Sequence, residues 1–214
     1  MSDKLIHEAV RLMMFDKQVK PYVFQNGEQH INNLHQAIQH NWNNSSISFL
    51  KQYTVGTSAS HFSAEGQGKS KLPQFLNAQS SSQIINKTKA YLQLWNQTHA
   101  GKTASVAQIR SVGLWEEISN FKFPSRQSPL VLTMREICMM FPDQLTTIAY
   151  LKDLRLSAKL LGIKSIQIHP LSLQGQIRII IDDFLHRHNT LYNHLTRFEK
   201  AAIAWWIPKA VNSI

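Results

Sequence analysis

Cysteine is nearly absent from this chain of 214 residues, which contains only Cys138. A single thiol cannot form an intrachain disulfide, and it cannot supply the paired cysteine ligands of a zinc finger. Cys138 lies within the apolar run Ile-Cys-Met-Met-Phe, where burial disfavours the reactive thiolate. The cysteine content therefore excludes a disulfide scaffold and indicates a reducing compartment.

Glycine and proline are also scarce, at 8 and 7 residues. A β-sandwich or β-barrel usually needs more turn-forming residues than that, so the composition favours helices. No stretch approaches the roughly 18 consecutive apolar residues of a membrane-spanning helix. The first residues, MSDKLIHEAVRLMMF, lack the apolar core of a signal peptide. We therefore expect an all-α protein without a membrane span that acts inside a cell.

Acidic residues are few: 13 Asp and Glu stand against 23 Lys and Arg, which gives a formal net charge of +10. Such an excess indicates a polyanionic partner, which would be nucleic acid, an anionic membrane surface or an acidic protein. The excess is uneven along the chain. Ten Lys and Arg but only three acids lie between Lys51 and Arg135, so this region holds +7 of the charge.

Two short segments match the end of the nucleotide-binding P-loop, GxxxxGK[ST]. They are Gly68-Lys69-Ser70 and Gly101-Lys102-Thr103. The motif needs another glycine five residues earlier, so that the backbone can wrap around phosphates, and a preceding strand. Ser63 and Asn96 occupy those positions, and neither segment follows a hydrophobic strand. We therefore do not expect nucleotide hydrolysis.

Histidine is frequent, with ten residues, but its spacing does not suggest a metal site. His186, His188 and His194 do not show the i, i+4 spacing of helical metal ligands. Asp182 and Asp183 are adjacent, so on a helix they point in different directions and do not form a catalytic carboxylate pair. We expect no metal, no cofactor and no enzymatic activity.

Apolar residues recur with helical periodicity along most of the chain. A turn at Gln25-Asn26-Gly27 precedes an expected helix from Ile31 through Trp42. A proline-containing break, Phe123 to Pro129, separates two halves, so we expect two helical lobes. Gly162 is a natural helix end. The other expected helices span residues 3–16, 82–95, 105–121, 132–141, 142–162, 177–185 and 190–206.

The basic residues near the break between the halves suit a groove that binds an RNA backbone, because unpaired Lys and Arg neutralise phosphates. Aromatic residues between them could stack on bases. The alternative is that these cations only solvate helix faces and that the aromatic residues belong to the core. The cations of this region that we consider candidates for RNA binding are Lys69, Lys71, Arg110, Lys122, Arg126 and Arg135.

Several short segments, in chain order, carry a family resemblance. They are Val19 to Gln25 (VKPYVFQ), Pro124-Ser125-Arg126 followed by Leu132 to Ile137 (LTMREI), His169-Pro170, His188 to Tyr192 (HNTLY) with Arg197, and Ala210 to Ser213 (AVNS). Together they resemble segments of the nucleoproteins of segmented negative-strand RNA viruses, of the phlebovirus and tenuivirus type.

The resemblance implies a two-lobed, all-helical protein that encapsidates single-stranded genomic RNA in a basic groove between the lobes. It also implies self-association through an N-terminal arm, location in the virion and the host cytoplasm, and the viral polymerase as a further partner. The implied division is an arm over residues 1–26, an N-terminal lobe over 27–123 and a C-terminal lobe over 124–214.

The same resemblance implies roles for particular residues. Arg126 and Arg135 would contact RNA phosphates, and Phe24 would line a pocket for base stacking. Lys69 and Lys71 lie in the stretch where the family carries basic groove residues. A different function also fits the composition: a non-enzymatic adaptor of an intracellular bacterium, of the secretion-system or effector type, that binds an acidic protein. Nucleic acid that copurifies with the protein would separate the two hypotheses.

Overall fold

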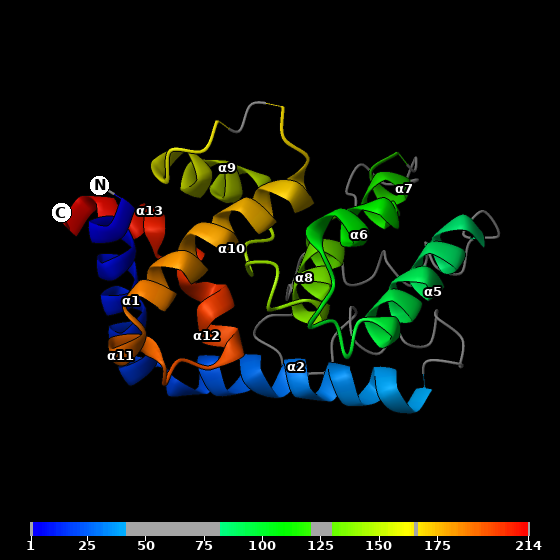
Figure 1. Ribbon diagram of the computed structural model, residues 1–214, viewed down its shortest axis with the longest axis horizontal. Helices are drawn as coiled ribbons and strands as arrows, with labels where there is room; N and C mark the ends of the chain where they lie inside the picture. The colour runs from blue at the N-terminus through cyan, green and yellow to red at the C-terminus, as the bar shows by residue number, and fades with distance from the viewer. Residues whose placement is uncertain (1, 42–81, 121–129, 165–166, 214) are drawn as a thin grey trace. The chain divides into compact units, whose positions relative to one another are not determined.

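The computed structural model describes residues 2–41, 82–120, 130–164 and 167–213. Every regular element within these ranges is a helix, and no strand occurs among them. The predicted all-α class is therefore confirmed (Figure 1).

Most helices in the described ranges are short, and four of them exceed 15 residues. These four are α1 (Ser2–Val19), α2 (Pro21–Asn41), α5 (Ser82–Gln97) and α10 (Pro170–Arg187). The first half continues with α6 (Val106–Ser111), α7 (Leu114–Asn120) and α8 (Leu130–Met140). The second half contains α9 (Leu151–Leu160), α11 (Asn189–Tyr192), α12 (Arg197–Ala202), η2 (Ile203–Trp205), α13 (Ile207–Ala210) and η3 (Val211–Ser213).

The chain forms two compact units whose boundaries differ from the predicted ones. Unit 1 comprises Met1–Glu28 together with Pro142–Ile214, and unit 2 comprises Gln29–Phe141. The predicted arm, residues 1–26, therefore shares a unit with the C-terminal helices. Helix α8, predicted in the C-terminal lobe, belongs to unit 2, where it contacts α7. The predicted boundary between 123 and 124 lies outside the described residues.

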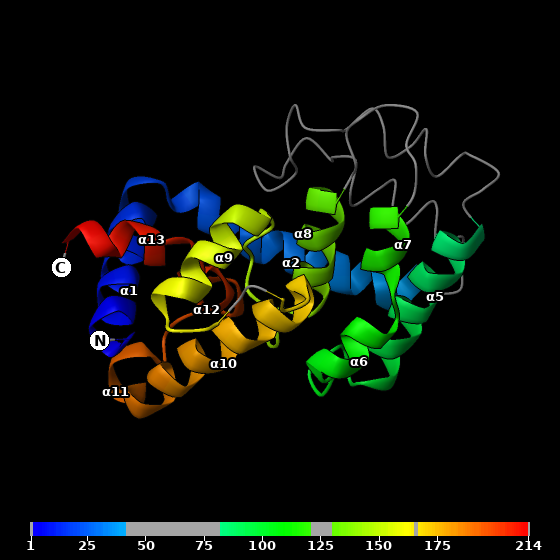
Figure 2. The ribbon, with the colours of Figure 1, turned by 90° about the horizontal axis from the view of Figure 1, so that it is seen from above.

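Helix α1 docks on the C-terminal part of its own chain. It lies beside α13, as Figures 1 and 2 show. Its buried residues recur with helical periodicity, so they form one apolar stripe. They are Leu5, Ile6, Ala9, Val10 and Met13. Sequence alone left open whether this helix packs in its own chain or on a neighbour, and in this structure it packs in its own chain.

Polar contacts fix α1 at both of its ends. Near the start of the helix, Arg187 forms an ion pair with Asp3 at 2.5 Å, and the hydroxyl of Tyr192 lies 2.6 Å from Nδ1 of His7. The hydrogen bond from Arg187 is the main cause that lowers the pKa of Asp3 below its ordinary value. Near the end of α1, the indole Nε1 of Trp206 donates to Asp16 at 2.7 Å.

The segment from Pro142 to Tyr150 is not the helix start that the sequence predicts. Its backbone carbonyls accept hydrogen bonds from side chains of α10 instead. Arg178 donates to the carbonyls of Pro142 and Leu145, and Gln174 donates to the carbonyl of Ile148. Both α10 side chains are buried. Because these contacts satisfy the buried carbonyls without helical hydrogen bonds, α9 begins only at Leu151.

The turn predicted at Gln25-Asn26-Gly27 is also absent, because α2 continues through these residues. Gly27 serves close packing: a Cβ atom at this position would lie 2.5 Å from the ring of Phe198. The chain bends earlier, at Lys20, which separates α1 from α2 and precedes Pro21 at the start of α2.

Two glycines and one capping residue set further helix boundaries. Gly113, with φ +72°, separates α6 from α7, where the sequence predicts one helix over 105–121. Gly162, with φ +81°, follows the end of α9, as predicted. The predicted helix over 190–206 is interrupted after Tyr192, and a capping box at Thr196 starts α12.

The core of unit 2 forms where α5 meets the helices that follow it. Tyr91 and Trp95 on α5 are almost completely buried. The Tyr91 hydroxyl donates to the carbonyl of Ile109 at 2.9 Å, and its ring lies 6.1 Å from that of Phe141. Burial raises the pKa of Tyr91 above its ordinary value, so this hydroxyl stays a neutral donor.

The contact of Gly27 with Phe198 leads to a stability prediction. Replacing Gly27 with Ala inserts a methyl group against a buried ring, and overpacking outweighs the gain in helix propensity. We expect a loss of about 1–2 kcal/mol in the free energy of unfolding, measured by chemical denaturation. The control Gln25→Ala, at an exposed position of the same helix, should stay within about 0.5 kcal/mol. Equal stabilities of the two variants would contradict this packing role.

Candidate anion-binding surface

The candidate RNA-binding cations fall into two groups in the structure. Lys69, Lys71, Lys122 and Arg126 lie outside the described residues. Arg110 lies in the last turn of α6, where it is exposed, and Arg135 is half-buried on α8. The structure therefore places two of the six cations, both in unit 2, and the other four stay sequence-based candidates.

Phe24, the predicted stacking residue, is part of the core of unit 1. Its side chain is only 4% exposed. The ring stacks on Trp206 at a centroid distance of 5.7 Å, and it meets Phe198 edge-on at 6.2 Å. A ring that is covered in this way has no free face for a base, so we assign Phe24 a packing role. The sequence signal for it, an aromatic residue in a family-like segment, also fits a core position.

Most acidic residues in the described part of the chain are engaged in ion pairs. Glu199, which is almost completely buried, accepts from Lys17 at 2.5 Å. In each pair the carboxylate is neutralised locally by a cation of the same chain. The other pairs are Arg11–Glu8, Lys87–Glu117, Arg178–Asp182, Arg187–Asp3, Arg187–Asp183, Arg197–Asp143 and Lys209–Asp16.

A set of exposed cations remains after this pairing. They have no ion-pair partner among the described residues, so their charge faces solvent. In unit 2 they are Lys89 and Arg110, and in unit 1 they are Lys4, Lys20, Lys152, Arg155, Lys159 and Lys164. The net positive charge of the sequence is therefore displayed on the surface and not neutralised within the fold.

Four of these cations cluster on and beside α9. Successive residues of a helix are turned by about 100°, so Lys152, Arg155, Leu156 and Lys159 share an arc of about 100° on one face. The opposite face carries the buried residues Leu154, Ser157 and Ala158. Lys164 follows after the helix ends. This spacing is readable in the sequence, but the greater charge density between Lys51 and Arg135 directed the prediction elsewhere.

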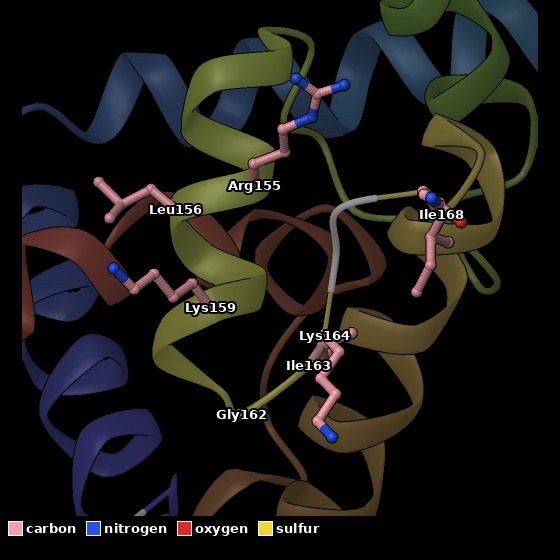
Figure 3. Close-up of a pocket in the computed structure, with 8 residues that line it drawn as sticks. Arg155, Leu156, Lys159, Gly162, Ile163, Lys164 and Ile168 are labelled. Carbon is pink, nitrogen blue, oxygen red and sulfur yellow. The ribbon is translucent and has the colours of Figure 1, made fainter.

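This cation cluster borders an open groove of about 980 Å³, which we call the α9 groove (Figure 3). Arg155, Leu156 and Lys159 project from α9, and the remaining lining residues belong to the segment between α9 and α10. Among the described residues, the lining includes no acidic residue and no aromatic ring. It consists of Arg155, Leu156, Lys159, Gly162, Ile163, Lys164, Gln167 and Ile168.

Other kinds of site were sought in the same residues. Within the described ranges, no group of three or more His, Cys, Asp or Glu side chains is arranged to hold a metal ion. None of the helices described here has the length and apolar character needed to cross a membrane. The clearest chemical feature of the described surface is therefore its exposed positive charge.

Comparisons with protein-family models, with curated proteins and with solved structures give no match for this chain.

The position of Phe24 leads to a second prediction. If Phe24 is a core residue, Phe24→Ala should lower the free energy of unfolding by about 3–5 kcal/mol, because a buried ring is lost and a cavity remains. Chemical denaturation measures this loss. Phe15→Ala, which removes a ring that is 59% exposed on α1, is the matched control and should have little effect. A stable Phe24→Ala protein with weakened RNA binding would restore the stacking role.

A third prediction separates the cations of the α9 groove from structural cations. Arg155→Ala and Lys159→Ala should each change the free energy of unfolding by no more than about 0.5 kcal/mol, because both side chains are exposed and neither has an ion-pair partner in the described part of the chain. Arg178→Ala should cost about 2–3 kcal/mol, because it leaves buried carbonyls without donors. Thermal or chemical unfolding of the three variants tests this contrast, which comparable losses in all three would contradict.

Proposed function

We propose that this protein is a non-enzymatic nucleoprotein that encapsidates single-stranded RNA through sequence-independent phosphate contacts. The observation that carries the proposal is the difference in ion pairing between acidic and basic side chains. In the described ranges most acids form ion pairs, whereas several exposed Lys and Arg side chains have no ion-pair partner there. An exposed surplus of this kind attracts a polyanion, and association releases the counterions that surround the phosphates.

The sequence resemblance directs the proposal from polyanions in general to RNA. The segments that resemble phlebovirus-type and tenuivirus-type nucleoproteins include Arg126 and Arg135, in the region of highest charge density. Exposed Lys89 and Arg110 extend this basic region within unit 2. In this proposal the protein occurs in the virion and in the host cytoplasm, where the polymerase would read the packaged RNA.

Self-association through the N-terminal arm belongs to the same proposal and has a structural requirement. Helix α1 covers its own chain through an apolar stripe and the polar contacts of Asp3, His7 and Asp16. An exchange of α1 between copies would have to break these contacts and re-form them on a neighbour. Because the exchanged contacts are the same, such an exchange has a low net cost in contact energy.

The test of RNA binding uses a fluorescently labelled oligouridylate of about 12 nucleotides, with an oligoadenylate of equal length for comparison. We expect fluorescence anisotropy to show similar affinities for both. The affinity should fall more than about tenfold between about 50 and 200 mM salt.

Charge reversal should locate the interaction. Lys89→Glu combined with Arg110→Glu should weaken binding about tenfold or more for both oligonucleotides, because each reversal removes a phosphate contact and adds repulsion. Lys4→Glu combined with Lys20→Glu makes the same change in net charge at exposed positions of the predicted arm, and it should have a smaller effect. Absence of RNA binding by the unaltered protein at low salt would refute the proposal and favour the adaptor function.

A further inference from the structure

The α9 groove combines side chains in a way that RNA packaging does not explain. Its lining holds three cations, Arg155, Lys159 and Lys164, together with aliphatic side chains, and no aromatic ring is found among the lining residues that the structure describes. Proteins that bind single strands without sequence preference stack the bases on aromatic rings. The groove offers contacts for negative charge but no such stacking surface.

Protein segments carry the complementary combination, since an amphipathic helix presents carboxylates and apolar side chains on neighbouring faces. We propose that the α9 groove binds an acidic amphipathic helix of a partner protein. This inference rests on unit 1 alone and does not depend on RNA binding by the protein.

The spacing of the cations supports a helical partner. Lys152 and Lys159 are seven residues apart, so they lie two turns and about 10 Å apart along α9, with Arg155 between them. Acidic residues on a partner helix recur with the same period when they occupy i, i+3 or i+4, and i+7. A partner helix that lies along α9 can therefore place one carboxylate near each cation.

The apolar side chains of the groove support the same partner. Leu156 lies on the cationic face of α9 and is 41% exposed. Ile163 and Ile168 are half-buried and line the groove with it. Burial of the apolar surface between the charged groups by a partner is favourable, because it removes this surface from water. An anion without apolar groups, such as free phosphate, would leave that surface exposed.

The charge distribution of the groove favours an acidic partner in particular. Asp153 is half-buried on the flank of α9 and does not line the groove. The other acids of unit 1 contact partners elsewhere, for example Asp143 with Arg197 and Asp182 with Arg178. The positive potential of the groove is therefore not compensated locally, and it would steer an acidic segment toward its site.

The size and the openness of the groove argue against a small ligand. A volume of about 980 Å³ is at the upper end of the range for small-molecule pockets, which enclose most of their ligand. This groove is open to solvent along α9, so an elongated ligand would use more of its lining.

The test uses the full chain and a synthetic labelled peptide of about 12 residues, which is three helical turns. The probe peptide has Leu on one helical face and Glu beside it. One control peptide has the same composition in an order that forms no apolar face, and another has Lys in place of each Glu. We expect only the acidic amphipathic peptide to bind in fluorescence anisotropy.

Variants locate the site. Arg155→Glu combined with Lys159→Glu should raise the Kd of the peptide at least about tenfold, and Leu156→Ser should raise it about threefold or more. Lys89→Glu combined with Arg110→Glu should leave the Kd within about twofold, because neither residue lines the groove and exposed charges outside a site are screened by salt. Unfolding curves confirm that each variant is folded. Methyl resonances of Leu156, Ile163 and Ile168 should shift when the unaltered protein binds the peptide.

Several results would overturn the inference. One is equal binding of the control peptide whose residue order forms no apolar face. The others are methyl shifts confined to residues outside the groove, and no binding of the acidic peptide at all. Oligouridylate provides the last arm of the experiment. If it displaces the peptide, and if reversal of Arg155 and Lys159 abolishes RNA binding, the groove is an RNA site. If the protein does not bind RNA but the peptide result holds, only the proposed function fails.

Discussion

The arrangement of unit 1 depends on the buried guanidinium group of Arg178. This group donates to the carbonyls of Pro142 and Leu145, and its Nε atom pairs with Asp182 on the same helix at 2.9 Å. Burial raises the pKa of Asp182 and the nearby guanidinium opposes that rise, so the pair has a desolvation cost as well as an attraction. The contacts hold the chain from Pro142 onward against α10, and that segment leads directly into α9. The position of the α9 groove therefore follows from a buried arginine that does not itself line the groove.

Pairing with carboxylates divides the cations of the described residues into two classes. Arginines such as Arg178, Arg187 and Arg197 form hydrogen-bonded pairs with carboxylates, as the planar guanidinium group favours. The exposed cations of α9 have no such partner among the described residues. Because the acids are largely engaged by the first class, the second class keeps its charge at the surface. A fold of net charge +10 thus separates structural cations from cations that are available to a partner.

Composition and helical periodicity were sufficient to predict the all-α class, and Gly162 was sufficient to predict where α9 ends. Tertiary contacts decided what these signals could not. Gly27 signals a turn in isolation, but the ring of Phe198 requires a residue without a side chain there, and the helix continues. Pro142-Asp143 resembles a helix start, but side chains of α10 satisfy the carbonyls that follow. Among the candidate site residues, Phe24 has the same sequence signal in a core as in a stacking pocket. The α9 cations were visible as a pattern, but their lack of acidic partners required the structure.

The proposed function requires the exposed surplus of positive charge to bind RNA. The most direct measurement is the ratio of absorbance at about 260 and 280 nm of freshly purified protein, because bound nucleic acid absorbs strongly at the shorter wavelength and survives purification at low salt. We expect a ratio well above that of protein alone, and this ratio should fall after a wash at high salt or after ribonuclease treatment. A ratio typical of pure protein, together with no uptake of added oligouridylate at low salt, would contradict it.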